Sequence, residues 1–213
     1  MSVAAGHRAN AGSVGAPANP RPPAPLVGVL ALQGGFEAHQ RVLERLGAAT
    51  RQVRVPAELD GLDALVLPGG ESTVMTLGIE RERLAEPLRA LAAVGTPILG
   101  TCAGMIILDR DHLGILDVRV RRNAFGRQLH SFEASFEVEG VAGGPVHAVF
   151  IRAPWVVEHG PGVRVLAELD GHPVAVRQGR VLAISFHPEL TGEDRLHALF
   201  LSMLEGAAPQ SAN

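Results

Sequence analysis

The chain has 213 residues, of which 46% are hydrophobic and 19% charged, and this composition suits one globular domain with a full apolar core. Its formal net charge of -3 argues against binding to nucleic acid or to an anionic membrane surface. A single cysteine excludes an internal disulfide framework and a multi-cysteine zinc site, and because no His-Glu-x-x-His pattern is present either, no metal or cofactor is expected.

The N-terminal segment differs in composition from the rest of the chain. Residues 1–25 are rich in Ala, Gly, Asn and Pro, which predicts a disordered extension without the apolar core of a signal peptide. We therefore expect the domain to span residues 26–205, followed by a flexible tail over residues 206–213. A lone reactive thiol is suited to a reducing compartment, so a cytoplasmic protein is expected.

Strand-like and helical patterns alternate in the first half of the domain. Residues 26–32 are a continuous apolar run, typical of a buried parallel strand, and residues 36–46 have helical spacing of their apolar side chains. Further strands are predicted at residues 49–55, 62–67 and 96–100, and helices at residues 74–79 and 83–93. This alternation predicts an α/β fold with an open, mostly parallel sheet flanked by helices.

The second half reads as short strands joined by glycine-rich links. These strands are predicted at residues 115–120, 129–137, 146–152, 163–169, 173–178 and 181–186. Short links favour antiparallel pairing, so additional antiparallel strands are expected here. Residues 193–204 form an amphipathic pattern that predicts a final helix.

The segment Gly100-Thr101-Cys102-Ala103-Gly104 joins a short apolar run to an apolar helical pattern. This is the layout of a nucleophile elbow, with sulfur in place of the serine oxygen. The two glycines leave room for the sharp turn, and the start of the following helix favours a thiolate. The backbone N–H of Ala103 is then an expected oxyanion donor. A lone cysteine is more often a buried apolar residue, so a catalytic role also requires a base elsewhere.

Among the nine histidines, His187 is the strongest candidate for that base. It follows an apolar run expected in the core and precedes Pro188 and Glu189. Proline holds the preceding residue extended, and residues two apart in an extended segment face the same side. We therefore expect Glu189 to orient the imidazole, although a turn with a surface acid would give the same pattern.

Two further features indicate anion binding. Residues 68–73, Pro-Gly-Gly-Glu-Ser-Thr, follow a predicted strand and precede a helix, where backbone N–H groups can face an anion or an oxyanion. Arg152 interrupts an otherwise apolar run, and a buried guanidinium there needs a structural carboxylate or a substrate carboxylate as partner. A role in anion binding is more ambiguous for Arg121, Arg122 and Arg127, because arginines gathered in a loop are usually solvated.

Taken together, the motifs Gly-Thr-Cys-Ala-Gly, Pro-Gly-Gly-Glu-Ser-Thr and Phe-His-Pro-Glu resemble those of the class I (triad) glutamine amidotransferases, whose fold is flavodoxin-like. Within this family, the chain resembles the glutaminase subunits of pyridoxal 5′-phosphate synthase, from about residue 26 to residue 204. This narrower resemblance is carried by Leu-Ala-Leu-Gln-Gly at 30–34, Arg-Asn-Ala-Phe-Gly-Arg-Gln at 122–128, Phe-Ile-Arg-Ala-Pro at 150–154 and Ser-Phe-His-Pro-Glu-Leu at 185–190. Two departures are a segment 109–114 that looks shorter than is usual in the family and residues 1–25, which have no counterpart.

The resemblance implies a catalytic triad of Cys102, His187 and Glu189, with oxyanion donors at Ala103 and Gly70. It also implies two binding positions: the partner near Gln33, and substrate glutamine against Gly70, Glu71, Ser72, Arg122, Ile151 and Arg152. The implied reaction is hydrolysis of L-glutamine to L-glutamate through a thioester, with the ammonia passing to a pyridoxal 5′-phosphate synthase subunit in a heteromeric complex for vitamin B6 biosynthesis. The residues alone give no reason to prefer Arg122 over Arg121.

Three other functions remain open on the sequence. A glutaminase that supplies histidine or purine synthesis is disfavoured by the Asn-Ala-Phe-Gly-Arg-Gln segment. A non-catalytic module that binds a partner would keep Cys102 only for packing. A cysteine peptidase or redox sensor on a related fold would have no need of the Phe-His-Pro-Glu segment or of a carboxylate clamp.

Overall fold

The computed structural model of the protein describes residues 24–125 and 131–205. Nearly all of the predicted extension, the whole predicted tail, Arg127 and the start of the strand predicted at residues 129–137 lie outside the described residues. Within the described ranges, no helix is both long enough and apolar enough to cross a bilayer.

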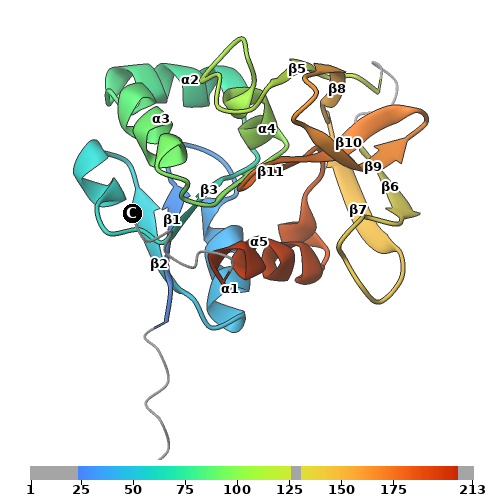
Figure 1. Cartoon of the computed structure of the whole chain (residues 1–213), viewed down its shortest axis with the longest axis horizontal. Coiled ribbons are helices and arrows are strands. Elements are labelled where there is room, and N and C mark those ends of the chain that lie inside the picture. Colours follow the sequence, from blue (N-terminus) through green and yellow to red (C-terminus); the bar gives the residue numbers. More distant parts are fainter. Residues whose placement is uncertain (1–23, 126–130, 206–213) are drawn as a thin grey trace, which may run out of the picture.

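A seven-stranded sheet forms the centre of the molecule, in the order β2-β1-β3-β4-β11-β10-β9 (Figure 1). The first five of these strands are parallel, whereas β10 is antiparallel to both β11 and β9. The strands are β1 (Leu26–Leu30), β2 (Ala49–Val53), β3 (Ala64–Leu67), β4 (Ile98–Thr101), β9 (Arg164–Leu169), β10 (His172–Gln178) and β11 (Val181–Ile184). The predicted α/β class, with a mostly parallel sheet, is confirmed.

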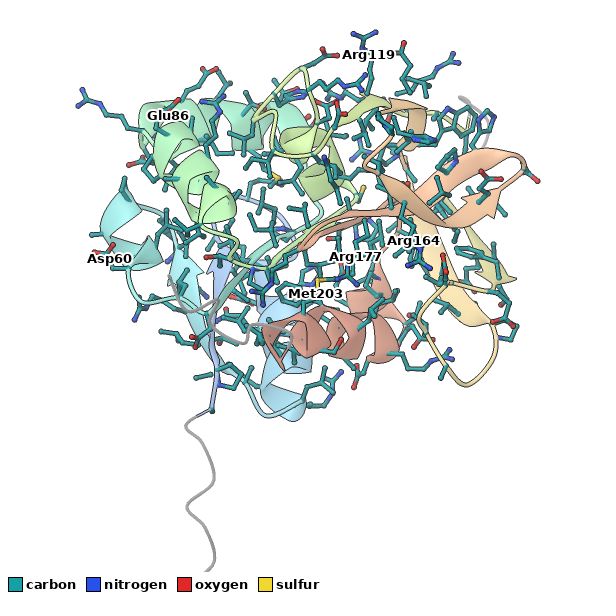
Figure 2. All side chains as sticks on the ribbon, viewed as in Figure 1. Asp60, Glu86, Arg119, Arg164, Arg177 and Met203 are labelled. Atoms are coloured by element: carbon teal, nitrogen blue, oxygen red, sulfur yellow. The ribbon has the colours of Figure 1, made fainter. Side chains whose placement is uncertain are left out.

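Helices cover both faces of this sheet (Figure 1). One face packs against α1 (Phe36–Arg45) and α5 (Arg195–Glu205), and the other against α2 (Ser72–Arg81), α3 (Ala85–Ala93) and α4 (Ala103–Leu108). Figure 2 shows Met203 between α5 and the sheet, where it is buried in the first of two apolar clusters. The central strands β1, β3 and β11 are apolar on both faces, as expected for a parallel sheet with helices on either side.

Two small antiparallel sheets lie beside the main one. They pair β5 (Val118–Arg121) with β8 (Trp155–His159), and β6 (Ser131–Phe136) with β7 (Val146–Ile151). Strand β8 was not predicted, because only Val156 in it is fully buried and the strand carries little apolar alternation. Antiparallel pairing prevails in the second half as expected, but β11 is parallel to β4 because it inserts into the core of the main sheet, where all four of its residues are buried.

The order of the parallel strands gathers several loops at one edge of the sheet. Strands β1, β3, β4 and β11 run in the same direction, so the loops that follow them emerge at the same edge. Ligand sites in open α/β sheets lie at this carboxyl edge. The four loops carry Gln33, the segment 69–72, Cys102 and His187.

Candidate active site

Cys102 occupies a strained turn between β4 and α4. Its φ of 48° and ψ of -103° place it outside the conformations that L-residues prefer, and its N–H donates to the Ile184 carbonyl at 2.8 Å. A Cβ on Gly104 would lie 2.0 Å from the Leu67 carbonyl oxygen, so only glycine allows α4 to start this close to β3. The predicted strand, sharp turn and helix around Cys102 are therefore confirmed.

His187 and Glu189 meet on the loop that follows β11. The His187 N–H donates to the Val149 carbonyl at 3.0 Å, and its Nδ1 lies 2.7 Å from Oε1 of Glu189. We expected the segment from His187 to Glu189 to be extended. This prediction is wrong in one respect, because Pro188–Leu190 form a 3₁₀ turn. The proline ring, with its fixed φ, starts this turn, which brings the carboxylate within hydrogen-bond distance of the imidazole Nδ1.

The charged forms of His187 and Glu189 stabilise each other. Burial lowers the pKa of His187, but hydrogen bonds to Cys102 and Glu189 outweigh it and raise the pKa to about 10. Burial likewise raises the pKa of Glu189, but the hydrogen bond and the positive charge of His187 leave it below its usual value. The site therefore favours an imidazolium beside a carboxylate whose side chain is only 2% exposed.

The glycine-rich segment after β3 forms the wall opposite the imidazole. A Cβ on Gly69 would lie 2.3 Å from Cε1 of His187, and one on Gly70 would lie 2.3 Å from Oε1 of Gln33. That same Oε1 accepts a hydrogen bond from the Glu71 N–H at 2.6 Å. The Gln33 side chain thus holds the segment in which the oxyanion donor Gly70 was expected.

The structure distinguishes the positions of Arg122 and Arg121 relative to the pocket, which the sequence could not do. The Arg122 guanidinium donates to the side chains of Glu71 at 3.3 Å and Thr73 at 3.2 Å. Arg121 is the last residue of β5 and does not line the pocket. Arg122 is therefore held beside the glycine-rich segment, with its charge at the pocket mouth.

Arg152 differs from its sequence-based prediction. It is exposed rather than buried, although it does line the pocket. Strand β7 ends at Ile151, and Arg152 takes a φ of 46°, so the alternation that would have turned it inward stops one residue earlier. The charge consequently stands at the rim and needs no buried partner.

All of the site residues proposed from the sequence line one pocket of about 340 Å³. They are Gln33, Gly70, Glu71, Ser72, Cys102, Ala103, Arg122, Ile151, Arg152, His187 and Glu189. Asn123, Ile106 and Leu190 line it as well and carried no signal of their own in the sequence. Residues of every expected class therefore meet in a space of the size that small-molecule sites have.

One pair of buried residues behind the pocket was not expected. His39 of α1 and His197 of α5 are both fully buried, and His39 Nε2 lies 3.5 Å from Oε2 of Glu189. A signal was present: His39 lies three residues after Phe36 and four before Leu43, on the apolar side of its helix. Across residues 24–125 and 131–205, no group of three or more His, Cys, Asp or Glu side chains is arranged to hold a metal ion.

Comparison with known proteins identifies a family whose sequences match this chain. The sequence profile of the SNO glutamine amidotransferase family matches residues 29–206. The pyridoxal 5′-phosphate synthase subunit PdxT of Mycolicibacterium vanbaalenii is 54% identical over 193 residues, covering 85% of this chain and 98% of the relative. The protein of the same name from Streptomyces avermitilis is 52% identical over 189 residues, covering 84% of this chain and 94% of the relative.

Solved structures agree with the fold. A crystal structure described as a glutamine amidotransferase superposes with a TM-score of 0.79 at 48% identity, covering 84% of this chain and 98% of the other. A chain from the structure of PurLQS from Thermotoga maritima superposes with a TM-score of 0.67 at 20% identity, covering 85% of this chain and 99% of the other. The second likeness concerns the fold alone.

Proposed function

Because this chain belongs to the SNO glutamine amidotransferase family, we propose that its pocket hydrolyses L-glutamine to L-glutamate and ammonia as the glutaminase subunit of a pyridoxal 5′-phosphate synthase. The observation that carries this proposal is the convergence of Cys102, His187 and Glu189 in one pocket. Relatives named as PdxT, at 52–55% identity, favour vitamin B6 biosynthesis over histidine or purine synthesis.

In the proposed reaction, the Cys102 thiolate attacks the side-chain amide carbon of glutamine. The N–H groups of Ala103 and Gly70 stabilise the oxyanion of the tetrahedral intermediate. The imidazolium of His187 gives its proton to the leaving nitrogen, so ammonia departs and a γ-glutamyl thioester remains. Water then attacks the thioester while neutral His187 takes its proton, and collapse of the intermediate releases glutamate and restores the Cys102 thiolate beside the His187 imidazolium.

Glutamine is proposed to bind with its polar ends at the pocket mouth. The wall on one side carries Glu71, Ser72 and Arg122, and the rim on the other carries Ile151 and Arg152. An arginine can bind the α-carboxylate of the substrate through two parallel hydrogen bonds. Both guanidinium groups face solvent here, so either can exchange a water contact for the substrate.

The partner is proposed to cover the same mouth. Leu190 lines the pocket and is exposed, and α2, whose first residue Ser72 also lines it, presents Val74 and Leu77 to solvent. Apolar side chains clustered around a site mark surfaces where another protein docks. A synthase subunit here would contact Gln33 and receive ammonia without its release to solvent. The mechanism needs a free thiol, so we expect the complex to act in the reducing cytoplasm.

Glutamate release from glutamine tests the proposal, measured with the purified protein alone, with a pyridoxal 5′-phosphate synthase subunit, and with Cys102→Ala. Activity that rises with the partner and is lost in the variant would support a coupled glutaminase. Equal activity of Cys102→Ala in the complex would contradict the mechanism. Binding of the partner without glutamate release would instead support a non-catalytic module.

A further inference from the structure

A buried polar chain extends from the pocket into the core of the protein. Glu189 Oε2 makes no hydrogen bond within the described residues and faces His39 Nε2 at 3.5 Å. His39 Nε2 also lies 3.1 Å from Thr101 Oγ1, and His39 Nδ1 lies 2.8 Å from His197 Nε2. His39, Thr101 and His197 are all fully buried. A buried carboxylate oxygen without a hydrogen bond calls for an explanation, and His39 is the polar group that faces it.

The hydrogen bonds of the chain select one tautomer for each imidazole. If His39 carried its proton on Nδ1, its Nε2 lone pair would face the Glu189 carboxylate and repel it. Placing the proton on Nε2 directs an N–H toward Thr101 and Glu189 and lets Nδ1 accept from His197 Nε2–H. His197 Nδ1, which has no hydrogen-bond partner within the described residues, is then a bare lone pair rather than a stranded donor.

The lowered pKa values of both imidazoles favour their neutral forms at pH 7. Burial lowers the pKa of His39 and outweighs the attraction of Glu189, while nearby His187 lowers it further. Burial lowers the pKa of His197 to about 3, and the neighbouring His39 and Arg45 add to this effect. Glu189 and Asp194 act in the opposite direction but do not offset it. A neutral N–H orients the carboxylate without cancelling its charge, so the charge remains available to the His187 imidazolium.

We propose that His39 is a positioning residue that holds Oε2 of Glu189 through its Nε2–H, with its tautomer fixed by His197, so that Oε1 stays aimed at His187. The function of this contact rests on the proposed glutaminase triad. The buried polar chain behind the triad then involves two helices, because α1 supplies His39 and α5 supplies His197. Docking of α1 and α5 on the sheet thereby fixes the orientation of the catalytic carboxylate.

The first test is the protonation state of the histidines in the wild-type chain, measured by ¹⁵N NMR of histidine-labelled protein. We expect His39 and His197 to be neutral at pH 7, each with its proton on Nε2. A proton on Nδ1 of His39, or a charged His39, would overturn the proposal. This measurement requires neither a variant nor glutaminase activity.

The second test compares His39→Leu, which removes the N–H, with His39→Gln, whose amide can replace it. The same NMR titration follows His187. We expect His39→Leu to lower the His187 midpoint by at least about one pH unit and His39→Gln to restore most of it, because a mobile Glu189 no longer stabilises the imidazolium. Leu43→Ala, a buried truncation on the same helix, is the control for lost stability and should leave the midpoint unchanged.

Turnover in the complex with the synthase subunit gives the functional readout. We expect His39→Leu to lower kcat about tenfold or more with little change in KM, because His39 does not touch the substrate pocket. A wild-type midpoint and kcat in folded His39→Leu would reduce His39 to a packing role and overturn the proposal. If the wild-type complex released no glutamate, the proposed function would fail, while the NMR titration would still decide whether His39 positions Glu189.

Discussion

The Nδ1 atom of His187 lies 2.7 Å from Oε1 of Glu189, although only Pro188 separates the two residues in the chain. A single 3₁₀ turn therefore supplies both the proposed base and the group that orients it. The proximity of these two residues is local to the chain, whereas the approach of Cys102 depends on the packing of distant segments. Strand β11 carries the pair to the edge where β4 delivers the thiol, because the two strands are parallel neighbours.

Glu189→Gln keeps the shape of the side chain and removes its charge. We expect a loss of kcat on the order of 10²–10⁴-fold, because the amide can no longer stabilise the imidazolium. The pKa of His187 should fall from about 10, which moves the basic limb of the pH–rate profile of the complex to lower pH. Glu193→Gln, at a mostly buried carboxylate paired with Arg195, is the control and should keep the wild-type profile. A wild-type basic limb in Glu189→Gln would contradict this role.

Gly69→Ala tests how closely the glycine-rich segment approaches the imidazole. The added Cβ would lie 2.3 Å from Cε1 of His187, so either the ring or the segment must move. Displacement of a catalytic group by about 1 Å costs roughly 10²-fold in rate, and kcat of the complex should fall by that order. Gly162→Ala is the matched control, because its Cβ would meet only Gln178 Nε2 at an ordinary 3.7 Å. Equal activity of the two variants would refute the steric argument.

Arg122→Ala and Arg121→Ala differ by one position and by their relation to the pocket. Arg122 lines it and donates to Glu71 and Thr73, whereas Arg121 ends β5 outside it. We expect KM for glutamine to rise about tenfold or more in Arg122→Ala, from the loss of a charged hydrogen bond on the order of 1.5–3 kcal/mol. Arg121→Ala should keep the wild-type KM in the same steady-state assay. An equal rise in both would argue for a general electrostatic effect instead.

The elements that the sequence predicted well are those with local causes. The apolar run of β1, the elbow at Cys102 and the pairing of His187 with Glu189 are each indicated by residues within a few positions of one another. The resemblance to glutamine amidotransferases then brought the separate motifs together, and the pocket contains every residue assigned from them. Local pattern and family motif thus agree at the centre of the site.

The elements that were missed depend on tertiary context. The inward turn expected for Arg152 assumed that β7 continues, but the strand stops at Ile151 and the backbone reverses. Parallel pairing of β11 with β4 follows from strand order, which no single segment encodes. The burial of His39 could be read from helical spacing, but its contact with Glu189 requires two elements that are 150 residues apart.

The buried histidine pair predicts an acid-sensitive fold. The folded pKa values of His39 and His197 are lowered, so the unfolded chain binds protons that the native chain does not, and stability falls as pH falls below about 6.5. His197, with a pKa of about 3, should alone remove about 1.5 kcal/mol of unfolding free energy between pH 6.5 and pH 5, and His39 adds to this loss. His187, whose folded pKa is raised, contributes stability that is fully present below pH 6.5 and therefore adds little slope there.

Urea unfolding of the wild type and of His197→Leu across that pH range measures the effect. The variant should lose about 1.5 kcal/mol of the change between pH 6.5 and pH 5, because the neutral imidazole of His197 is gone. The interval avoids the carboxylates, whose own protonation affects stability at lower pH. Equal wild-type stability at pH 6.5 and pH 5 would show that the pair takes up protons while folded, contrary to its burial.

Leu77→Asp tests the surface proposed to bind the synthase subunit. Leu77 is 60% exposed on α2, one turn after Val74 and on the helix whose first residue lines the pocket. A carboxylate there must be desolvated when an apolar partner surface covers it, so the Kd for the synthase subunit should rise about tenfold or more. Val94→Asp places the same charge at a 79% exposed position after α3 and should bind as the wild type does. Calorimetric titration of the synthase subunit with both variants measures the two Kd values. The substitution leaves the buried core of the helix intact, so an unchanged Kd for Leu77→Asp would place the interface away from α2.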